Sequence, residues 1–177
     1  MNYHNITYPD MNNGDGLRVV LWLSGCSHHC FNCQNPQTWD VDSGIPFDES
    51  AKEELFRELD KDYISGLTLS GGDPLHEANL DGVLDLVNEI RLSFPNKSIW
   101  IYSGYQWSEI FNDGVYLTKN CYGRKRREIV RQCTVMVDGR YIDSQRNPSK
   151  KWAGSNNQHV IDIQQSLQKG EIVLWKC

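Results

Sequence analysis

Four apolar segments of this chain each end in a short polar or glycine-containing stretch. The segments cover residues 17–23, 67–70, 98–102 and 133–137, and they are followed by Ser24-Gly25-Cys26, Gly71-Gly72-Asp73, Ser103-Gly104 and Asp138-Gly139. Their length and apolar character predict strands, and the segments between them carry helical patterns. Strands that alternate with helices form a parallel sheet, whose strand carboxyl ends lie along one edge. The sequence therefore predicts an α/β fold, built around a parallel sheet core, with its functional residues gathered at that edge.

The other segments extend this pattern over a single domain, residues 1–177. Ser50, followed three residues later by Glu53, has the capping-box pattern and predicts a helix that begins there. Residues 114–132 show little apolar periodicity, and we interpret this region as a surface insertion. Further elements are predicted as an amphipathic helix over 80–90, a short helix over 107–111, and late strands over 159–163 and 171–175.

Composition excludes several classes of protein. Hydrophobic residues are 39% and charged residues 23% of the chain, which is typical of a folded globular protein. No apolar run approaches the roughly 20 residues of a membrane helix, and the N-terminus lacks the features of a secretory signal, so we expect a cytoplasmic protein with no membrane contact. The net charge of −5 argues against nucleic-acid binding, and we interpret the basic run 124–127 as a solvated face.

Three of the six cysteines lie within eight residues of one another. Cys26, Cys30 and Cys33 have the spacing C-x3-C-x2-C on a loop directly after a predicted strand. Cysteine thiolates hold iron–sulfur clusters, and three thiolates on a [4Fe–4S] cube leave the fourth iron open for a reacting group. We interpret the other three as non-ligands: Cys121, Cys133 and Cys177.

Zinc is the alternative metal for this loop. His28 or His29 could complete a Cys3His set with the three cysteines. Structural zinc sites usually draw ligand pairs from two separated segments, and the sequence offers no second pair. The spacing therefore favours a cluster over zinc, with both histidines as loop residues near it.

The chain resembles the radical S-adenosylmethionine (SAM) superfamily, because C-x3-C-x2-C follows the first predicted strand and Gly-Gly-acidic follows the second. More narrowly, it resembles the activating proteins of the anaerobic ribonucleoside-triphosphate reductase. This resemblance implies a partial, incomplete β/α barrel. The stretches that carry it span nearly the whole chain in order: 13–16, 25–30, Asn35 with Thr38-Trp39, 69–75, 100–105, 137–141 and 152–158.

The resemblance also implies roles for individual residues. Cys26, Cys30 and Cys33 ligate the [4Fe–4S] cluster, and SAM chelates the open iron. Reduction of the cluster then cleaves SAM to methionine and a 5′-deoxyadenosyl radical. Gly71 and Gly72 let the backbone approach the methionyl group of SAM, whose ammonium donates to Asp73. The remaining SAM contacts are expected from Asn32, Cys33 and Gln34 at the adenine, and from Ser103 and Asp138 at the ribose or carboxylate region.

By the same resemblance, the substrate is a protein. The radical abstracts hydrogen from a backbone glycine of the large subunit of the anaerobic ribonucleoside-triphosphate reductase, which then stores a glycyl radical. A flavodoxin-type protein is the implied electron donor, and a homodimer is left open. Two alternatives remain at this point. One is a different radical SAM activity, and the other is a zinc-binding interaction module that does not respond to SAM.

Overall fold

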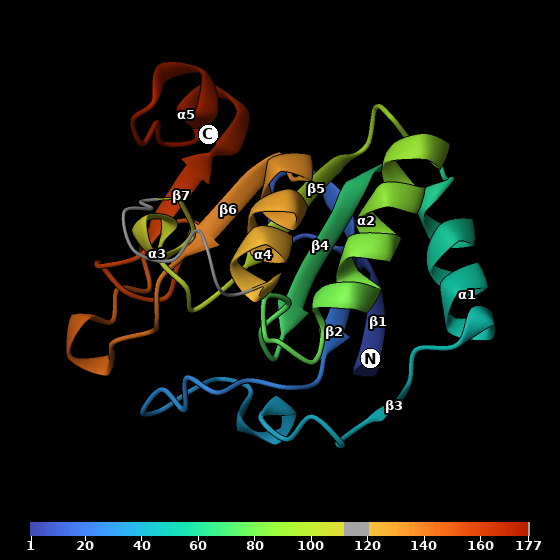
Figure 1. Cartoon of the computed structure of the whole chain (residues 1–177), viewed down its shortest axis with the longest axis horizontal. Coiled ribbons are helices and arrows are strands. Elements are labelled where there is room, and N and C mark those ends of the chain that lie inside the picture. Colours follow the sequence, from blue (N-terminus) through green and yellow to red (C-terminus); the bar gives the residue numbers. More distant parts are fainter. Residues whose placement is uncertain (112–120, 177) are drawn as a thin grey trace.

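The computed structural model describes residues 1–111 and 121–176, and its centre is one open, mixed sheet (Figure 1). The sheet has seven strands in the order β3-β1-β2-β4-β5-β6-β7. The four central neighbours β2, β4, β5 and β6 are parallel, whereas β1, β3 and β7 pair antiparallel at the edges. The strands are β1 (Asn2–Asp10), β2 (Leu17–Leu23), β3 (Ile45–Pro46), β4 (Ile64–Gly71), β5 (Ser98–Tyr102), β6 (Val135–Asp138) and β7 (His159–Asp162).

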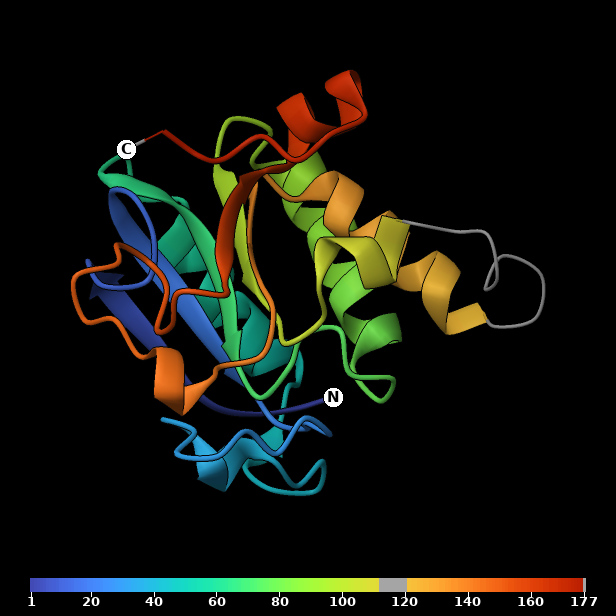
Figure 2. The same ribbon diagram turned by 90° about the vertical axis from the view of Figure 1, so that its left-hand side faces the viewer.

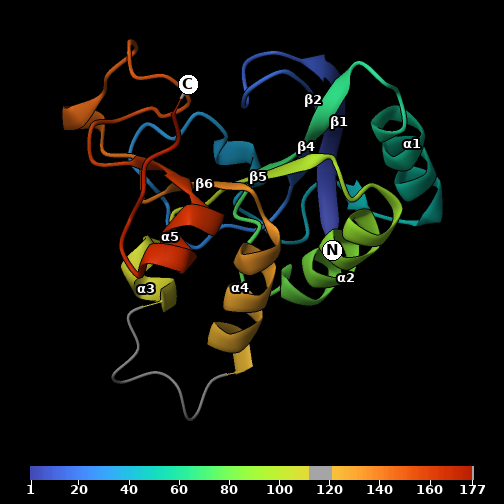
Figure 3. The ribbon, with the colours of Figure 1, turned by 90° about the horizontal axis from the view of Figure 1, so that it is seen from above.

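Helices cover one face of this sheet. In Figure 3, α1, α2 and α4 lie together on that face, while Figure 2 shows the segment 139–158 and the end of the chain against the other face. The expected parallel core is confirmed for the four central strands. The sheet is not closed, so the expected barrel is not confirmed. The helices are α1 (Glu49–Leu59), α2 (Leu80–Ser93), α3 (Trp107–Phe111), α4 (Cys121–Gln132) and α5 (Ile163–Lys169), with short 3-10 turns η1 (Pro36–Thr38) and η2 (Asp143–Gln145).

Burial explains why the central strands read as continuous apolar runs. Val19, Val20 and Leu21 in β2 are all fully buried, which is the pattern of a parallel strand covered on both faces. In α2, the buried positions recur every three or four residues, so one stripe of the helix packs on the sheet. No helix in the described part of the chain is long and apolar enough to cross a membrane.

One charged side chain is buried within this apolar core. Arg18 of β2 is fully buried, and its Nε donates to Thr68 Oγ1 at 2.6 Å. Its terminal nitrogens donate to the backbone oxygens of Asp15, Leu67 and Ser98. Burial lowers the pKa of Arg18 to about 10. This guanidinium ties the amino ends of three parallel strands together, at the end of the sheet opposite the cysteine loop.

Two local predictions were wrong, and one strand was missed. Helix α1 begins at Glu49 and is capped by Asp48, whose carboxylate accepts from the backbone N–H of Ala51, so Ser50 is not the cap. Strand β1 was not predicted at all. The strand expected over 171–175 is reduced to an isolated bridge between Leu174 and Ile161.

The expected insertion over 114–132 is described only from residue 121 onward, and residues 114–120 lie outside the described residues. Residues 121–132 form α4, which packs against α2 and buries Ile129 and Val130. The single-domain organisation and the insertion stay predictions. Cys133, expected to be buried, is fully buried, and Cys177 lies outside the described residues.

Candidate iron–sulfur site

The cysteine loop is closed at its base by backbone hydrogen bonds. The N–H of Gly25 donates to the carbonyl of Thr38 at 2.7 Å, and the N–H of Cys26 donates to that of Trp39 at 2.9 Å. Gly25 has φ +93°, a left-handed conformation that favours glycine, and this lets the chain leave β2 sharply. The three cysteines therefore lie on a loop whose two ends are held together.

The tip of β4 is fastened directly to this loop. Gly72 N–H donates to the carbonyl of Leu23 and Asp73 N–H to that of Gly25, both at 2.7 Å. A Cβ at position 72 would lie 2.5 Å from the Gly25 oxygen, closer than packed atoms allow. Glycine at 72 is thus required by contact between two strand tips. The sequence argument gave a different reason, which was access for SAM.

Asp73 is the centre of a buried hydrogen-bond network. Its carboxylate is 2% exposed and accepts from the backbone N–H groups of Leu75 and Gly104 and from the Ser103 hydroxyl, at 2.8–3.1 Å. His28 Nε2 lies 2.7 Å from its second oxygen. A buried carboxylate is stable only when paired in this way. Asp73 therefore joins the tips of β4 and β5 to the cysteine loop.

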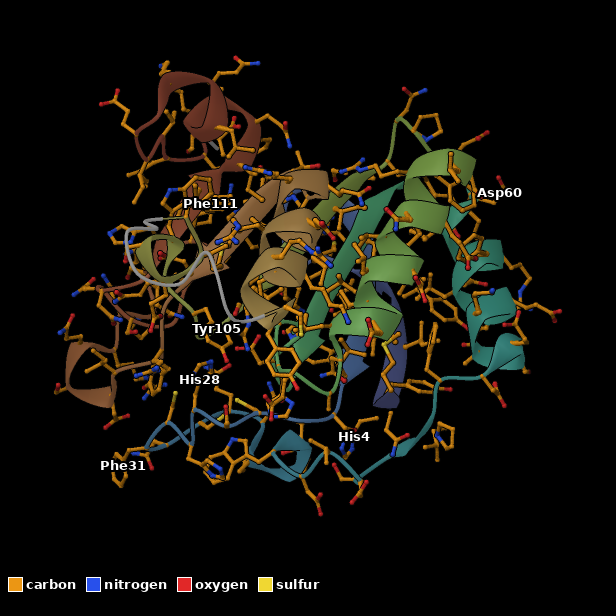
Figure 4. The ribbon with its side chains drawn as sticks, viewed as in Figure 1. His4, His28, Phe31, Asp60, Tyr105 and Phe111 are labelled. Carbon is orange, nitrogen blue, oxygen red and sulfur yellow. The ribbon has the colours of Figure 1, made fainter. Side chains whose placement is uncertain are left out.

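His28 is held on several sides. Arg140 Nε donates to His28 Nδ1 at 3.0 Å, and because arginine has no acceptor, Nδ1 carries the lone pair and Nε2 the proton that is donated to Asp73. The ring meets Tyr105 edge-on at 4.8 Å and lies against Gly104. Figure 4 shows His28 beside Tyr105, with Phe31 at the far tip of the loop.

Two adjoining cavities lie at this edge of the sheet. The smaller, of about 140 Å³, is lined by seven of the predicted site residues: Cys26, Cys30, Cys33, Gly71, Gly72, Asp73 and Ser103. The larger, of about 440 Å³, shares Cys30 and Cys33 with the first and adds Gln34. The sequence analysis therefore identified seven of the seventeen residues that line the smaller cavity, among them all three cysteines.

Two predicted site residues lie outside the walls of both cavities. Asn32 is exposed, with φ +55°. Asp138 is 2% exposed and accepts from the backbone N–H groups of Trp107 and His159, so it fixes the tip of β6 to the start of α3. The position of Asp138 at a strand tip was predicted correctly. Its carboxylate, however, accepts hydrogen bonds from the protein backbone.

The sequence analysis did not identify several residues that line the larger cavity away from the cysteines. Trp22 and Ser70 are register partners on β2 and β4, and both line the larger cavity with Tyr102. Each lies at or next to the last residue of its strand, which is the one signal that could have identified them. Tyr141 and Gln158 line both cavities and come from the segment on the open face of the sheet.

The thiols suit an iron–sulfur cluster in number and surroundings. Burial raises the pKa of Cys26 to about 11, and burial also raises the pKa of Cys30. Metal binding must therefore displace their protons. In a cluster each thiolate binds a different iron, so the thiols need to line one cavity and need not meet at one point. Among the described residues, no group of three or more His, Cys, Asp or Glu is arranged around a single metal ion.

The histidines do not complete a zinc set in this arrangement. Both ring nitrogens of His28 are engaged, by Asp73 and Arg140. The ring of His29 packs edge-on against Trp39 at 4.7 Å. The loop therefore offers three thiols without a nitrogen ligand, which fits a cluster with one open iron better than a four-ligand zinc site.

Comparisons with known proteins agree with this chemistry. Residues 12–161 match the family described as a 4Fe-4S single cluster domain. Over 162 residues the chain is 38% identical to an anaerobic ribonucleoside-triphosphate reductase-activating protein of Escherichia coli (strain K12), covering 90% of this chain and 97% of the relative. Proteins of the same name match at 38% identity in Enterobacteria phage T4, covering 90% and 93%, and at 35% in Haemophilus influenzae, covering 90% and 97%.

The fold and the site thus define a single-cluster [4Fe–4S] protein. Within that class, the chain belongs to the family of anaerobic ribonucleoside-triphosphate reductase-activating proteins.

Proposed function

We propose that this chain is a radical SAM activase that generates a glycyl radical on the anaerobic ribonucleoside-triphosphate reductase. The observation that carries the proposal is the smaller cavity, where three free thiols face the tips of β4, β5 and β6. A [4Fe–4S] cluster bound there would supply the electron that cleaves SAM reductively. The protein's own task is to position both groups and to exclude competing reactions.

The proposed roles follow the lining of the cavities. Cys26, Cys30 and Cys33 hold the cluster. Gly71, Gly72 and Ser103 form the wall nearest the methionyl part of SAM, and the loop backbone at Asn32, Cys33 and Gln34 receives the adenine. Asp73 and Asp138 act through the strand tips that they fix, because their oxygens already accept several hydrogen bonds.

The names of the relatives give the anaerobic ribonucleoside-triphosphate reductase as the partner of this reaction. We assign the contact to its large subunit. The larger cavity supports this, since it adjoins the cysteines and is lined by polar and aromatic side chains that suit a peptide loop. We further propose that the protein works in the cytoplasm and receives its electron from a flavodoxin-type donor. A homodimer is the oligomeric state that we would test first. The consecutive order of β2, β4, β5 and β6, with helices on one face, supports assigning the sheet to the incomplete β/α barrel type.

Anaerobic reconstitution with iron and sulfide tests the proposal. The reduced protein should give a [4Fe–4S]⁺ electron paramagnetic resonance signal whose shape changes when SAM is added. Adding the reductase should then produce a glycyl radical signal and release one methionine per radical formed. A protein that binds zinc tightly and assembles no cluster would overturn the proposal. A cluster signal that ignores SAM would also overturn it.

A further inference from the structure

Both the side chain and the backbone of Arg140 make contacts that hold this residue beside the cysteine loop. Its Nε donates to His28 Nδ1 at 3.0 Å, and its terminal nitrogen lies 3.6 Å from a carboxylate oxygen of Glu109. Its backbone carbonyl accepts from the side-chain amide of Asn157 at 2.8 Å. The side chain of Arg140 is 55% exposed, so core packing does not explain its placement.

Cys30 lies beside this arginine. Arg140, Tyr141 and Cys30 together line the smaller cavity and a neighbouring one of about 340 Å³. Cys26 and Cys33 line the smaller cavity as well. The chain just after β6 therefore places the cation of Arg140 in the wall of the cavity that all three thiols line.

Charges and N–H···S hydrogen bonds near ligating sulfurs are known controls of iron–sulfur reduction potentials. Reduction of the cluster adds one electron and makes the site more negative, and a nearby cation stabilises that form. We propose that Arg140, positioned by His28, raises the reduction potential of the [4Fe–4S] cluster. This inference rests on the proposed function. The electron comes from an external one-electron donor protein of the flavodoxin class, which is oxidised by one electron as [4Fe–4S]²⁺ becomes [4Fe–4S]⁺.

Two carboxylates near Arg140 allow the direction of a change in reduction potential to be predicted for a second variant. Glu109 lies against Arg140 and partly neutralises its charge. Asp73 lies on the opposite side of His28 from Arg140 and lines the smaller cavity together with the thiols. Removing the charge of Glu109 should therefore shift the potential in the direction opposite to removal of Arg140.

The test compares Arg140→Gln, Arg140→Lys and Glu109→Gln with the unsubstituted chain. Arg57→Gln is the matched control, because Arg57 lies on α1 with its side chain 65% exposed, away from both cavities. Each reconstituted protein is titrated with dithionite at controlled potentials, and the reduced cluster is quantified by electron paramagnetic resonance. For Arg140→Gln we expect the ratio of reduced to oxidised cluster at a fixed potential to fall about tenfold, a shift of about 59 mV for a one-electron couple.

Arg140→Lys and Arg57→Gln should stay close to the unsubstituted chain, and Glu109→Gln should raise the ratio. Because Arg140 is partly exposed, these shifts should shrink as salt is added. An unchanged potential in Arg140→Gln at full iron content would overturn the inference. If Arg140→Gln holds no iron, the absence of an upward shift in Glu109→Gln would do the same. The titration needs neither SAM nor the reductase, so its failure is distinct from failure of the proposed function, which would appear as a lack of cluster in the unsubstituted chain.

Discussion

His28 Nε2 lies 2.7 Å from Asp73 Oδ2, so a residue between two cysteines is hydrogen-bonded to the tip of the neighbouring strand β4. The side chains of both residues are almost fully buried, at 5% and 2% exposed. Together they turn the cysteine loop and two further strand tips into one connected unit.

His28→Ala should loosen this unit. It removes one donor from a buried carboxylate, which costs about 1–3 kcal/mol of unfolding free energy. His28→Gln offers an amide N–H to Asp73 and should recover part of that loss. Urea unfolding of the metal-free chain and iron content after reconstitution measure both effects. Equal stability and iron content in the alanine variant and the unsubstituted chain would show that the contact is dispensable.

Gly72→Ala should disturb the cysteine loop even though position 72 binds no iron. The new Cβ would lie 2.5 Å from the Gly25 carbonyl oxygen, and overpacking of this kind costs about 1–3 kcal/mol. Gly123→Ala is the control, because among the described residues no atom outside its own turn of α4 lies within 4 Å of a Cβ there, and alanine favours the helix by up to about 1 kcal/mol. The free energy of unfolding, measured from denaturation curves, and the iron content after reconstitution should both fall for Gly72→Ala and not for Gly123→Ala.

Cys30→Ala should lose most of its iron and keep its fold. Cys30 is only half-buried and lies outside the hydrophobic core, so the scaffold does not depend on it. Cys121→Ala, at an exposed position on α4, is the matched thiol control and should retain iron. His29→Ala should also retain its iron. A complete loss of iron in that variant would restore the four-ligand alternative.

Cys133 should make the metal-free chain less stable in alkali. Burial raises the pKa of Cys133 from 9.0 to about 12, with the charge of Arg91 opposing. Between these values the unfolded thiol loses its proton while the folded thiol keeps it, so stability falls as pH rises above about 9. Cys133→Ala should flatten this fall by up to about 1.4 kcal/mol per pH unit. Denaturant unfolding between pH 8 and 10 measures the slope, which Cys121→Ala should leave unchanged.

Arg18→Lys should lower stability without altering the cluster. Lysine cannot reproduce the fork of donors that meets Thr68 and the carbonyls of Leu67 and Ser98, and leaving buried acceptors unpaired costs about 3 kcal/mol. Because Arg18 lies at the other end of β2 from the cysteines, the electron paramagnetic resonance spectrum of the reduced protein should stay the same. A changed spectrum would show that the two ends of the sheet are coupled.

The parallel core could be predicted because its strands are buried on both faces. They therefore appear in the sequence as apolar runs, and each run is followed by a polar or glycine-containing stretch. Strand β1 could not, because only Tyr3 and Ile6 of its residues are buried and the others are exposed or half-buried. The opposite error occurred at 171–175, where an apolar segment forms one isolated bridge to β7, flanked by backbone hydrogen bonds of Val173 and Trp175, and no strand. Apolar character thus indicated burial more reliably than it indicated pairing.

In the site, local motifs identified the thiols and the glycine tips. The hydrogen-bond partners of Asp73 could not be predicted from the sequence, because they are residues up to 45 positions away in the chain. The same applies to Arg140, which reaches His28 over 112 positions. A motif gives the residue type at a position, whereas the partners of a buried polar group depend on the completed fold.

The backbone bonds that close the cysteine loop, from Gly25 to Thr38 and from Cys26 to Trp39, involve no metal ligand side chain. Closure of the loop therefore uses no bond to a metal, unlike a zinc finger, which folds around its ion. We expect a chain whose cluster has been destroyed by oxygen to keep its shape and to accept new iron and sulfide. On this expectation, oxygen damage is reversed by resupplying iron and sulfide, without synthesis of a new chain.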